Sequence, residues 1–182
     1  MKHRLIALLF SFWASVMVFG QTPLTTDRIL KDAQAEARRE KKNVFIIFHA
    51  SWCGWCHKMD SSLNDRNCKK FFDDNYVIRH LVVYESKGKK NLENPGGIEL
   101  VTKYGGKDMG LPFWLILDQD GNLLADSQIK PAGASSTAPA QNCGCPAAKE
   151  EVSYFIDVLR KTSSMNDQQA GLIEKRFREN EE

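Results

Sequence analysis

Two short apolar runs organise the middle of the chain. Residues 44–48 and 113–117 are continuously apolar and rich in β-branched and aromatic side chains, which is typical of strands that are buried on both faces. Residues 76–84 read as another strand. Residues 122–126 read as a strand that follows the tight turn 118–121.

The segments between these strands have helical periodicity or turn-forming composition. Helices are predicted at 29–37, 59–75, 98–104 and 150–161, with a short docked helix at the end of the chain. The first helix has N-cap candidates at 25–27, and the second is expected to kink near 64–67. A polar loop is expected at 85–97. The order of these elements predicts an α/β fold in which one mixed sheet is covered by helices on both faces.

The first twenty residues differ from the rest of the chain. Lys2 and Arg4 precede an apolar run at 5–19, and small residues lead up to Gln21. This pattern predicts a secretory signal peptide at 1–20, cleaved before Gln21. An uncleaved membrane anchor is the alternative, but the run is shorter than the roughly 20 residues that span a bilayer, so cleavage is favoured. We expect no stable membrane insertion after it. The mature domain, 21–182, is then exported to the periplasm or the extracellular space.

Charge and cysteine content narrow the possible functions. The chain has 25 Lys and Arg residues, of which two lie in the predicted signal peptide, and 23 Asp and Glu residues. The mature domain is therefore formally neutral, which argues against nucleic acid as its partner. Outside the cytosol disulfides persist, and an odd number of cysteines leaves at least one unpaired in a monomer. The five cysteines are Cys53, Cys56, Cys68, Cys143 and Cys145.

The sequence Trp52-Cys-Gly-Trp-Cys56 lies where a buried strand gives way to a helix. Cys53 is expected near the helix N-terminus, where free N–H groups and the helix dipole favour a thiolate, the attacking species in disulfide exchange. Cys56 comes about one turn later. We therefore predict that Cys53 is the more acidic and more exposed thiol, and that Cys56 resolves the mixed disulfide.

A proline marks the start of the later apolar run. Pro112, after Gly110 and Leu111, directly precedes residues 113–117, and a proline at the mouth of a buried strand indicates a special peptide bond, which we predict to be cis.

With these two features the chain resembles the thioredoxin superfamily over roughly residues 44–161. It is most similar to small exported members in which Met and Asp, here Met59 and Asp60, follow the motif. The resemblance implies a thioredoxin-like fold and a thiol–disulfide oxidoreductase without a cofactor or metal, acting on protein or peptide disulfides with an unidentified redox partner. It implies that Cys53 is the nucleophile and Cys56 the resolving thiol. It also implies that Pro112 shapes the substrate groove and that the backbone of Leu111 pairs with substrate.

Several positions depart from the family pattern. Trp55 stands where thioredoxins have proline, and Ile47 stands where they have a buried acid. His49 is a candidate replacement for that acid, but a histidine bonded to backbone at the strand end is the favoured interpretation. Trp52 and Trp55 are candidates for an apolar rim that contacts substrate, and packing over the motif is the alternative for Trp52.

Other functions also match parts of the sequence. Cys53–His57 matches the C-x-x-C-H attachment sequence of c-type haem, yet the buried strand before it and the proline and hairpin after it favour the redox enzyme. His57 is then an exposed helix residue whose charge would stabilise a Cys53 thiolate. A non-enzymatic binding module is a further alternative. The intact cysteine pair favours the enzyme, because a binding scaffold does not need both sulfurs.

The remaining cysteines have separate interpretations. Cys68 shares an apolar helix stripe with Phe71 and Phe72 and is expected to be a buried small hydrophobe. Cys143 and Cys145 lie in a segment rich in small residues, 130–148, predicted to be a flexible insertion that runs away from the redox motif. They could form a strained C-x-C disulfide, bind a soft metal with His57 or His49, or act as a structural clasp. We favour the clasp over an electron relay to Cys53.

Overall fold

The computed structural model describes residues 22–130 and 139–181. The predicted signal peptide and residues 131–138 of the predicted insertion lie outside the described residues. Within the described ranges, no helix combines the length and the apolar character needed to cross a bilayer.

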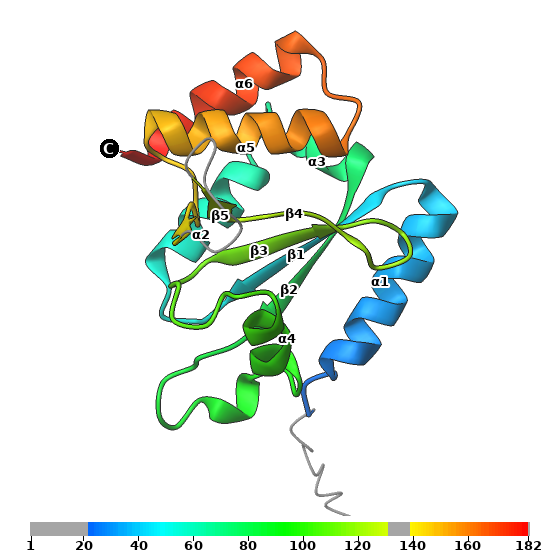
Figure 1. Cartoon of the computed structure of the whole chain (residues 1–182), viewed down its shortest axis with the longest axis vertical. Helices are drawn as coiled ribbons and strands as arrows, with labels where there is room; N and C mark the ends of the chain where they lie inside the picture. Colours follow the sequence, from blue (N-terminus) through cyan, green and yellow to red (C-terminus); the bar gives the residue numbers. More distant parts are fainter. Residues whose placement is uncertain (1–21, 131–138, 182) are drawn as a thin grey trace, which may run out of the picture.

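A four-stranded sheet forms the centre of the fold (Figure 1). Its strand order is β2-β1-β3-β4, with β1 and β2 parallel and the pairs β1–β3 and β3–β4 antiparallel. This is the mixed sheet predicted from the apolar runs. The strands are β1 Asn43–His49, β2 Tyr76–Val82, β3 Phe113–Leu117 and β4 Leu123–Asp126.

The central strand β1 contributes to a core layer on each face of the sheet. Phe45 and Ile47 pack into one apolar cluster, while Val44, Ile46 and Phe48 pack into the other. This division follows from the twofold alternation of side chains along a strand. Because both faces are buried, the sequence of β1 is continuously apolar rather than alternating.

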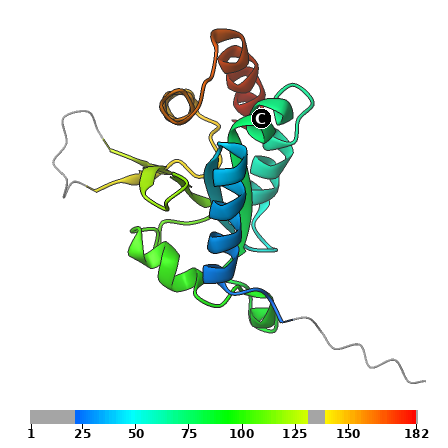
Figure 2. The same cartoon turned by 90° about the vertical axis from the view of Figure 1, so that its right-hand side faces the viewer.

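Helices cover both faces. Residues of α2, α3, α5 and α6 belong to the cluster around Phe45, and residues of α1 and α4 belong to the cluster around Val44. Figure 1 and Figure 2 show α5 and α6 lying side by side, away from α1 and α4. The helices are α1 Thr26–Glu40, α2 Gly54–Leu63, α3 Lys69–Asn75, α4 Gly97–Lys103, α5 Lys149–Thr162 and α6 Asp167–Arg178, with short 3-10 turns at Lys90–Leu92 and Glu179–Glu181.

The single kinked helix predicted at 59–75 is wrong, since this segment contains two separate helices, and the first begins earlier, at Gly54. The break comes from side chains that bond to nearby backbone. Asn64 Nδ2 donates to the Asp60 carbonyl at 2.9 Å, and Asp65 Oδ1 accepts from the Asn67 amide at 2.9 Å. Short polar side chains of this kind offer the backbone an alternative to helical hydrogen bonds.

The described part of the predicted insertion is folded rather than flexible. Its strand β6, Gln141–Asn142, pairs with β5, Gln128–Ile129, and Figure 2 shows this small hairpin projecting from the main sheet. Residues 143–147 are buried. The prediction failed because composition reports small side chains but not the tertiary contacts that fix them.

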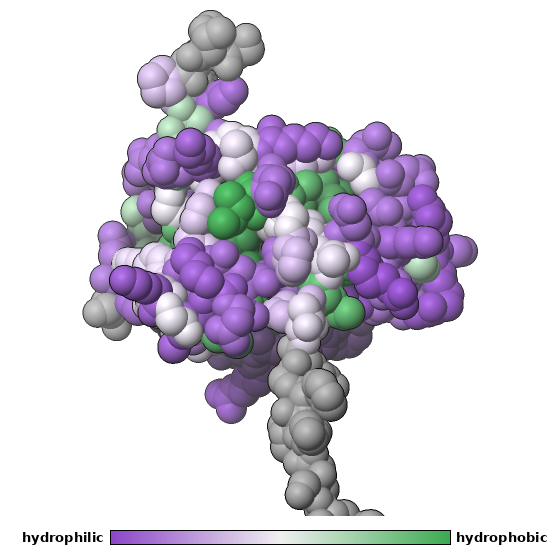
Figure 3. Space-filling view, turned by 90° about the horizontal axis from the view of Figure 1, so that it is seen from below, coloured by the Kyte–Doolittle hydropathy of each residue, from purple (hydrophilic) through white to green (hydrophobic). Residues whose placement is uncertain are grey.

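The surface seen from below in Figure 3 is mostly hydrophilic, and apolar side chains form only small patches on it. This is the ordinary distribution for a surface exposed to water.

Gly106 allows a close approach between the end of α4 and the start of β3. A Cβ atom at this position would lie 2.6 Å from Val101 Cγ2 and 2.9 Å from the ring of Phe113. We expect Gly106→Ala to lower the free energy of unfolding by about 1–3 kcal/mol through overpacking, measured by urea denaturation.

The matched control is Gly171→Ala in α6, where a Cβ would meet no atom within 4 Å. Because alanine favours helix more than glycine by up to about 1 kcal/mol, this variant should keep or gain stability. Equal behaviour of the two variants would contradict the packing argument.

Candidate active site

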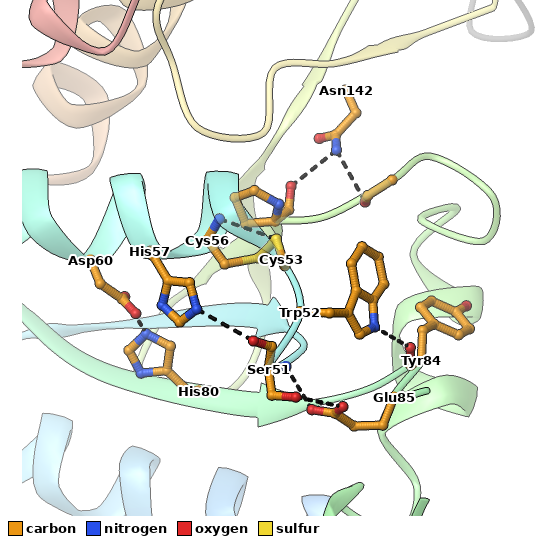
Figure 4. The surroundings of a disulfide bond; sticks show 12 residues. Ser51, Trp52, Cys53, Cys56, His57, Asp60, His80, Tyr84, Glu85 and Asn142 are labelled. Carbon is orange, nitrogen blue, oxygen red and sulfur yellow. Dashed lines mark hydrogen bonds and ion pairs between the residues drawn. A yellow bond between two sulfur atoms is a disulfide. The ribbon is translucent and has the colours of Figure 1, made fainter. Parts of the chain in front are cut away.

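Cys53 and Cys56 form a disulfide where β1 leads into α2 (Figure 4). Their Cα atoms are 5.2 Å apart. The two residues are 3% and 2% exposed, so in the disulfide form exposure does not separate them as the sequence analysis predicted. Both pack with Ala50 and Leu111 in a small cluster of their own.

Hydrogen bonding does distinguish the two sulfurs. Cys53 is the N-cap residue of α2, and its Sγ accepts a hydrogen bond from the Cys56 amide at 3.1 Å. When the disulfide is reduced, this N–H and the positive end of the helix dipole favour the thiolate at Cys53. Cys56 lies inside the first turn of the helix. This geometry favours a thiolate at Cys53 over one at Cys56, while the roles of attacking and resolving sulfur stay a prediction.

The Leu111–Pro112 loop lies against the disulfide. The peptide bond between these residues is cis, in agreement with the sequence prediction. Pro112 is buried, while Leu111 is partly exposed and packs against both cysteines. The fold thus brings together two segments that are nearly sixty residues apart in the sequence.

The two tryptophans of the motif are largely exposed. Trp52 is 58% exposed and its Nε1 donates to the Tyr84 carbonyl at 2.9 Å, while Trp55 is 48% exposed and lies beneath the Lys58 ammonium, 4.8 Å from the ring centroid. Both rings are thus accessible beside the motif, and a contact with substrate stays a prediction for both tryptophans.

A buried carboxylate supports the segment before Cys53. Glu85 Oε1 accepts from the Ser51 amide at 2.6 Å and Oε2 accepts from the Ser51 hydroxyl at 2.9 Å. These bonds, led by the one from the backbone amide, hold the pKa of Glu85 below its usual range. Glu85 lies in a loop, as predicted, but no role was predicted for it. The signal that could have found it is the parallel pairing of β1 and β2, because the residues after their carboxyl ends meet at one edge of the sheet.

Histidines gather on the side of α2 that faces β2. His80 bonds Asp60 at 2.8 Å, and its ring packs edge-on against His49 with centroids 5.0 Å apart. Burial, followed by the charge of His80, lowers the pKa of His49, which favours the neutral imidazole. The backbone bond expected for the His49 side chain is not among the hydrogen bonds of the described residues. His57 is exposed, as predicted, with Nε2 3.4 Å from the Ser51 carbonyl oxygen.

The segment that contains Cys143 and Cys145 returns to the redox site, contrary to the expectation that it runs away from it. A cavity of about 240 Å³ is lined by residues of this segment together with Trp55 and Leu111. Asn142 Nδ2 lies 3.0 Å from the Pro112 carbonyl oxygen. No signal in the sequence marked Asn142, because its role depends on a contact thirty residues away along the chain.

Cys143 and Cys145 are buried free thiols, so the C-x-C disulfide, one of the three alternatives, does not form in this structure. Burial raises the pKa of Cys143 strongly and that of Cys145 to about 12. Cys68 is likewise buried, as predicted, with its pKa raised by burial to about 11. In the described ranges, no three or more His, Cys, Asp or Glu side chains are grouped so that they could hold a metal ion.

The last turn of the described chain fastens the Cys145 segment to α2. Asn180 Nδ2 lies 3.4 Å from Cys145 Sγ and 2.9 Å from Ser62 Oγ, and Asn180 is itself buried. Lys58 Nζ donates to the Asn180 carbonyl at 2.7 Å, and Arg178 donates to the Ala147 carbonyl. These contacts anchor the segment to α2 and to the end of the described chain, while a clasp formed by the two cysteines themselves stays a prediction.

A mixed sheet with a Cys-x-x-Cys disulfide at the start of α2 and a cis-proline beside it defines a thioredoxin-like protein. The family model described as thioredoxin-like matches residues 26–119, more than half of the chain, and the chain belongs to this family. A search of curated proteins finds no match.

Solved structures with a similar fold include a disulphide isomerase, a DsbH oxidoreductase and a domain of DsbD. A disulphide isomerase from Xylella fastidiosa Temecula1 is 22% identical over 62% of this chain and 80% of its own, with a TM-score of 0.46. A structure named DsbH oxidoreductase is 17% identical over 85% of this chain and 95% of its own, with a TM-score of 0.42. The C-terminal domain of DsbD from Neisseria meningitidis, in its oxidised form, is 20% identical over 57% of this chain and 84% of its own, with a TM-score of 0.39.

The burial and hydrogen bonding of the cysteines predict an order of reactivity. In the reduced protein at neutral pH, limiting iodoacetamide should modify Cys53 first, because its thiolate is favoured, and should leave Cys68, Cys143 and Cys145 unmodified. Peptide mapping by mass spectrometry measures the order. The same protein unfolded in guanidinium should react at all five positions, and early modification of Cys143 or Cys145 in the native state would contradict the assignment.

Replacing Glu85 by glutamine should remove a contribution to the free energy of unfolding that depends on pH in the acid range. Because the Ser51 bonds lower the pKa of Glu85 in the folded state, the carboxylate stabilises the fold above the ordinary glutamate pKa of about 4.3. This contribution is lost as the pH falls from there through the lower folded-state pKa. From about pH 5 downward, the unfolding free energy of Glu85→Gln should therefore decrease less than that of the wild type in urea denaturation.

The control for this series is Glu174→Gln, which makes the same change of charge at an exposed position of α6. It should follow the wild-type pH dependence. If Glu85→Gln also parallels the wild type, the support assigned to Glu85 is wrong.

Proposed function

We propose that the protein is an exported thiol–disulfide oxidoreductase that acts on disulfides of proteins or peptides through Cys53 and Cys56. The observation that carries this proposal is the placement of the Cys53 sulfur at the N-terminus of α2, under the Cys56 amide and beside the Leu111–Pro112 loop. This arrangement favours a thiolate at Cys53, the species that attacks a disulfide.

The reaction follows from the two sulfurs. In the reducing direction, the Cys53 thiolate attacks one sulfur of a substrate disulfide, forms a mixed disulfide and releases the other substrate sulfur as a thiolate. The Cys56 thiolate then attacks Cys53, forms the intramolecular disulfide and releases the second substrate thiolate. Two electrons pass from the protein to the substrate, and the two released thiolates take up protons from solvent. The reverse sequence oxidises a substrate dithiol.

The substrate would lie across the disulfide between the tryptophans and the cis-proline loop. Trp52 and Trp55 offer exposed aromatic surface for apolar side chains of a substrate. Pro112 shapes the groove and the backbone of Leu111 pairs with the substrate chain. The proposed partners are therefore polypeptides that contain disulfides, together with a second redox protein that restores the Cys53–Cys56 pair.

The proposed location outside the cytosol rests on the sequence of residues 1–20, with its basic start and short apolar run. In such a compartment substrate disulfides persist, so a disulfide-exchange enzyme has material to act on.

Single substitutions of the two cysteines should have different results. Cys53→Ser should abolish the reduction of insulin disulfides in the presence of dithiothreitol, because the attacking sulfur is lost. Cys56→Ser should instead accumulate mixed disulfides with substrate, because no thiol remains to resolve them. Turbidity measures insulin reduction, and mass spectrometry without reductant measures the mixed disulfide.

The control is Cys68→Ala, which removes a buried thiol outside the motif and should retain activity. Activity that survives in Cys53→Ser would place the redox centre elsewhere and overturn the proposal.

A further inference from the structure

The segment Asn142–Cys145, which we call the return turn, is attached to the body of the protein from behind. The Cys143 amide donates to the Ser127 carbonyl at 2.7 Å, and the indole of the fully buried Trp114 donates to the Gly144 carbonyl at 2.8 Å. Behind the turn, Glu151 Oε2 accepts from the amides of Ala147 and Ala148, each at 3.0 Å. The turn is therefore a fixed point against which a neighbouring loop can be held.

The neighbouring loop is the one that carries Leu111 and Pro112. Asn142 Nδ2 lies 3.2 Å from the Met109 carbonyl oxygen, 3.3 Å from that of Gly110 and 3.0 Å from that of Pro112. These carbonyls belong to residues on both sides of Leu111. One amide group thus spans the part of the loop that faces the disulfide, and Figure 4 shows Asn142 directed toward it.

The orientation of this amide is set by its other end. Asn142 Oδ1 accepts a hydrogen bond from the Gly144 amide at 3.1 Å, so the oxygen faces its own turn and the nitrogen faces the loop. Gly144 has a φ of +56°, and a Cβ atom on it would lie 3.3 Å from the Pro112 carbonyl oxygen. The return turn and the loop therefore fit closely at two adjacent residues.

The residue between the bonded carbonyls is left available. Leu111 makes no backbone hydrogen bond to any residue in the ranges that the structure describes, and it is partly exposed beside the two cysteines. A backbone segment that is unpaired but held on both sides can pair with an incoming extended chain. The entropy cost of binding is then smaller, because the segment is already ordered.

We propose that Asn142 is a positioning residue for the redox reaction, which fixes the Leu111–Pro112 loop in the conformation that binds polypeptide substrates. This inference rests on the proposed function. Small disulfides reach the sulfur of Cys53 without pairing to the loop, so Asn142 acts on polypeptide substrates and leaves the chemistry of the cysteine pair unchanged.

The test is Asn142→Asp, which keeps the shape of the side chain but turns the two N–H donors into an acceptor facing three carbonyl oxygens. The KM for a disulfide-containing polypeptide should rise about tenfold, the equivalent of one or two lost hydrogen bonds. Turnover of a small aromatic disulfide and the reduction potential of the Cys53–Cys56 pair should stay at their wild-type values. The control is Gln141→Glu, which makes the same change of charge at the exposed neighbouring residue and should leave all three quantities unchanged.

A second variant covers the case in which Asn142→Asp does not fold. Gly144→Ala presses on the Pro112 carbonyl from the same turn without changing Asn142, and it should produce the same selective rise in the KM for polypeptides. Two results overturn the proposal for a folded variant. One is a polypeptide KM within twofold of wild type, and the other is an equal loss with the small disulfide or a shifted potential. An inactive wild type would instead refute the proposed function itself.

Discussion

The pairing of β1 along both of its edges is the constraint on which the rest of the structure depends. All seven residues of β1 pair with β2, and five of them also pair with β3. With both faces buried as well, β1 has little freedom to move, and its carboxyl end is a rigid platform. Cys53 and Cys56 follow that end directly, so the position of the disulfide is fixed by the centre of the sheet and not by a surface loop.

The redox site is completed by supports that reach this platform from two sides. On the side of β2, Glu85 holds Ser51, and the carbonyl of Tyr84 holds Trp52. On the side of β3, Asn142 holds the loop before Phe113. In the view of Figure 4 these supports lie on opposite sides of the disulfide. The surface around the disulfide is therefore built from four segments that lie far apart in the sequence, and hydrogen bonds to backbone groups set their relative positions.

The sequence allowed the framework to be predicted because its signals are local. Each of these signals can be recognised within a few residues. They are the apolar runs at 44–48 and 113–117, the two cysteines one turn apart, and the proline before a buried strand. The supports could not be predicted in this way. Glu85 lies in the predicted loop, but its role could not be predicted because its partner is 34 positions away. Cys143 and Cys145 looked flexible because their neighbours in the sequence are small, whereas their burial comes from Trp114 and from the helices at the end of the chain.

The contacts of Asn180 affect the order in which the site can form during synthesis. Cys53 and Cys56 are made more than a hundred residues before Asn180, which ties the Cys145 segment to Ser62 of α2. A growing chain therefore has its reactive pair long before that tie is in place. Until Asn180 has been made, the return turn beside the disulfide lacks this anchor, so the last residues of the chain complete a site whose cysteines come from its first third.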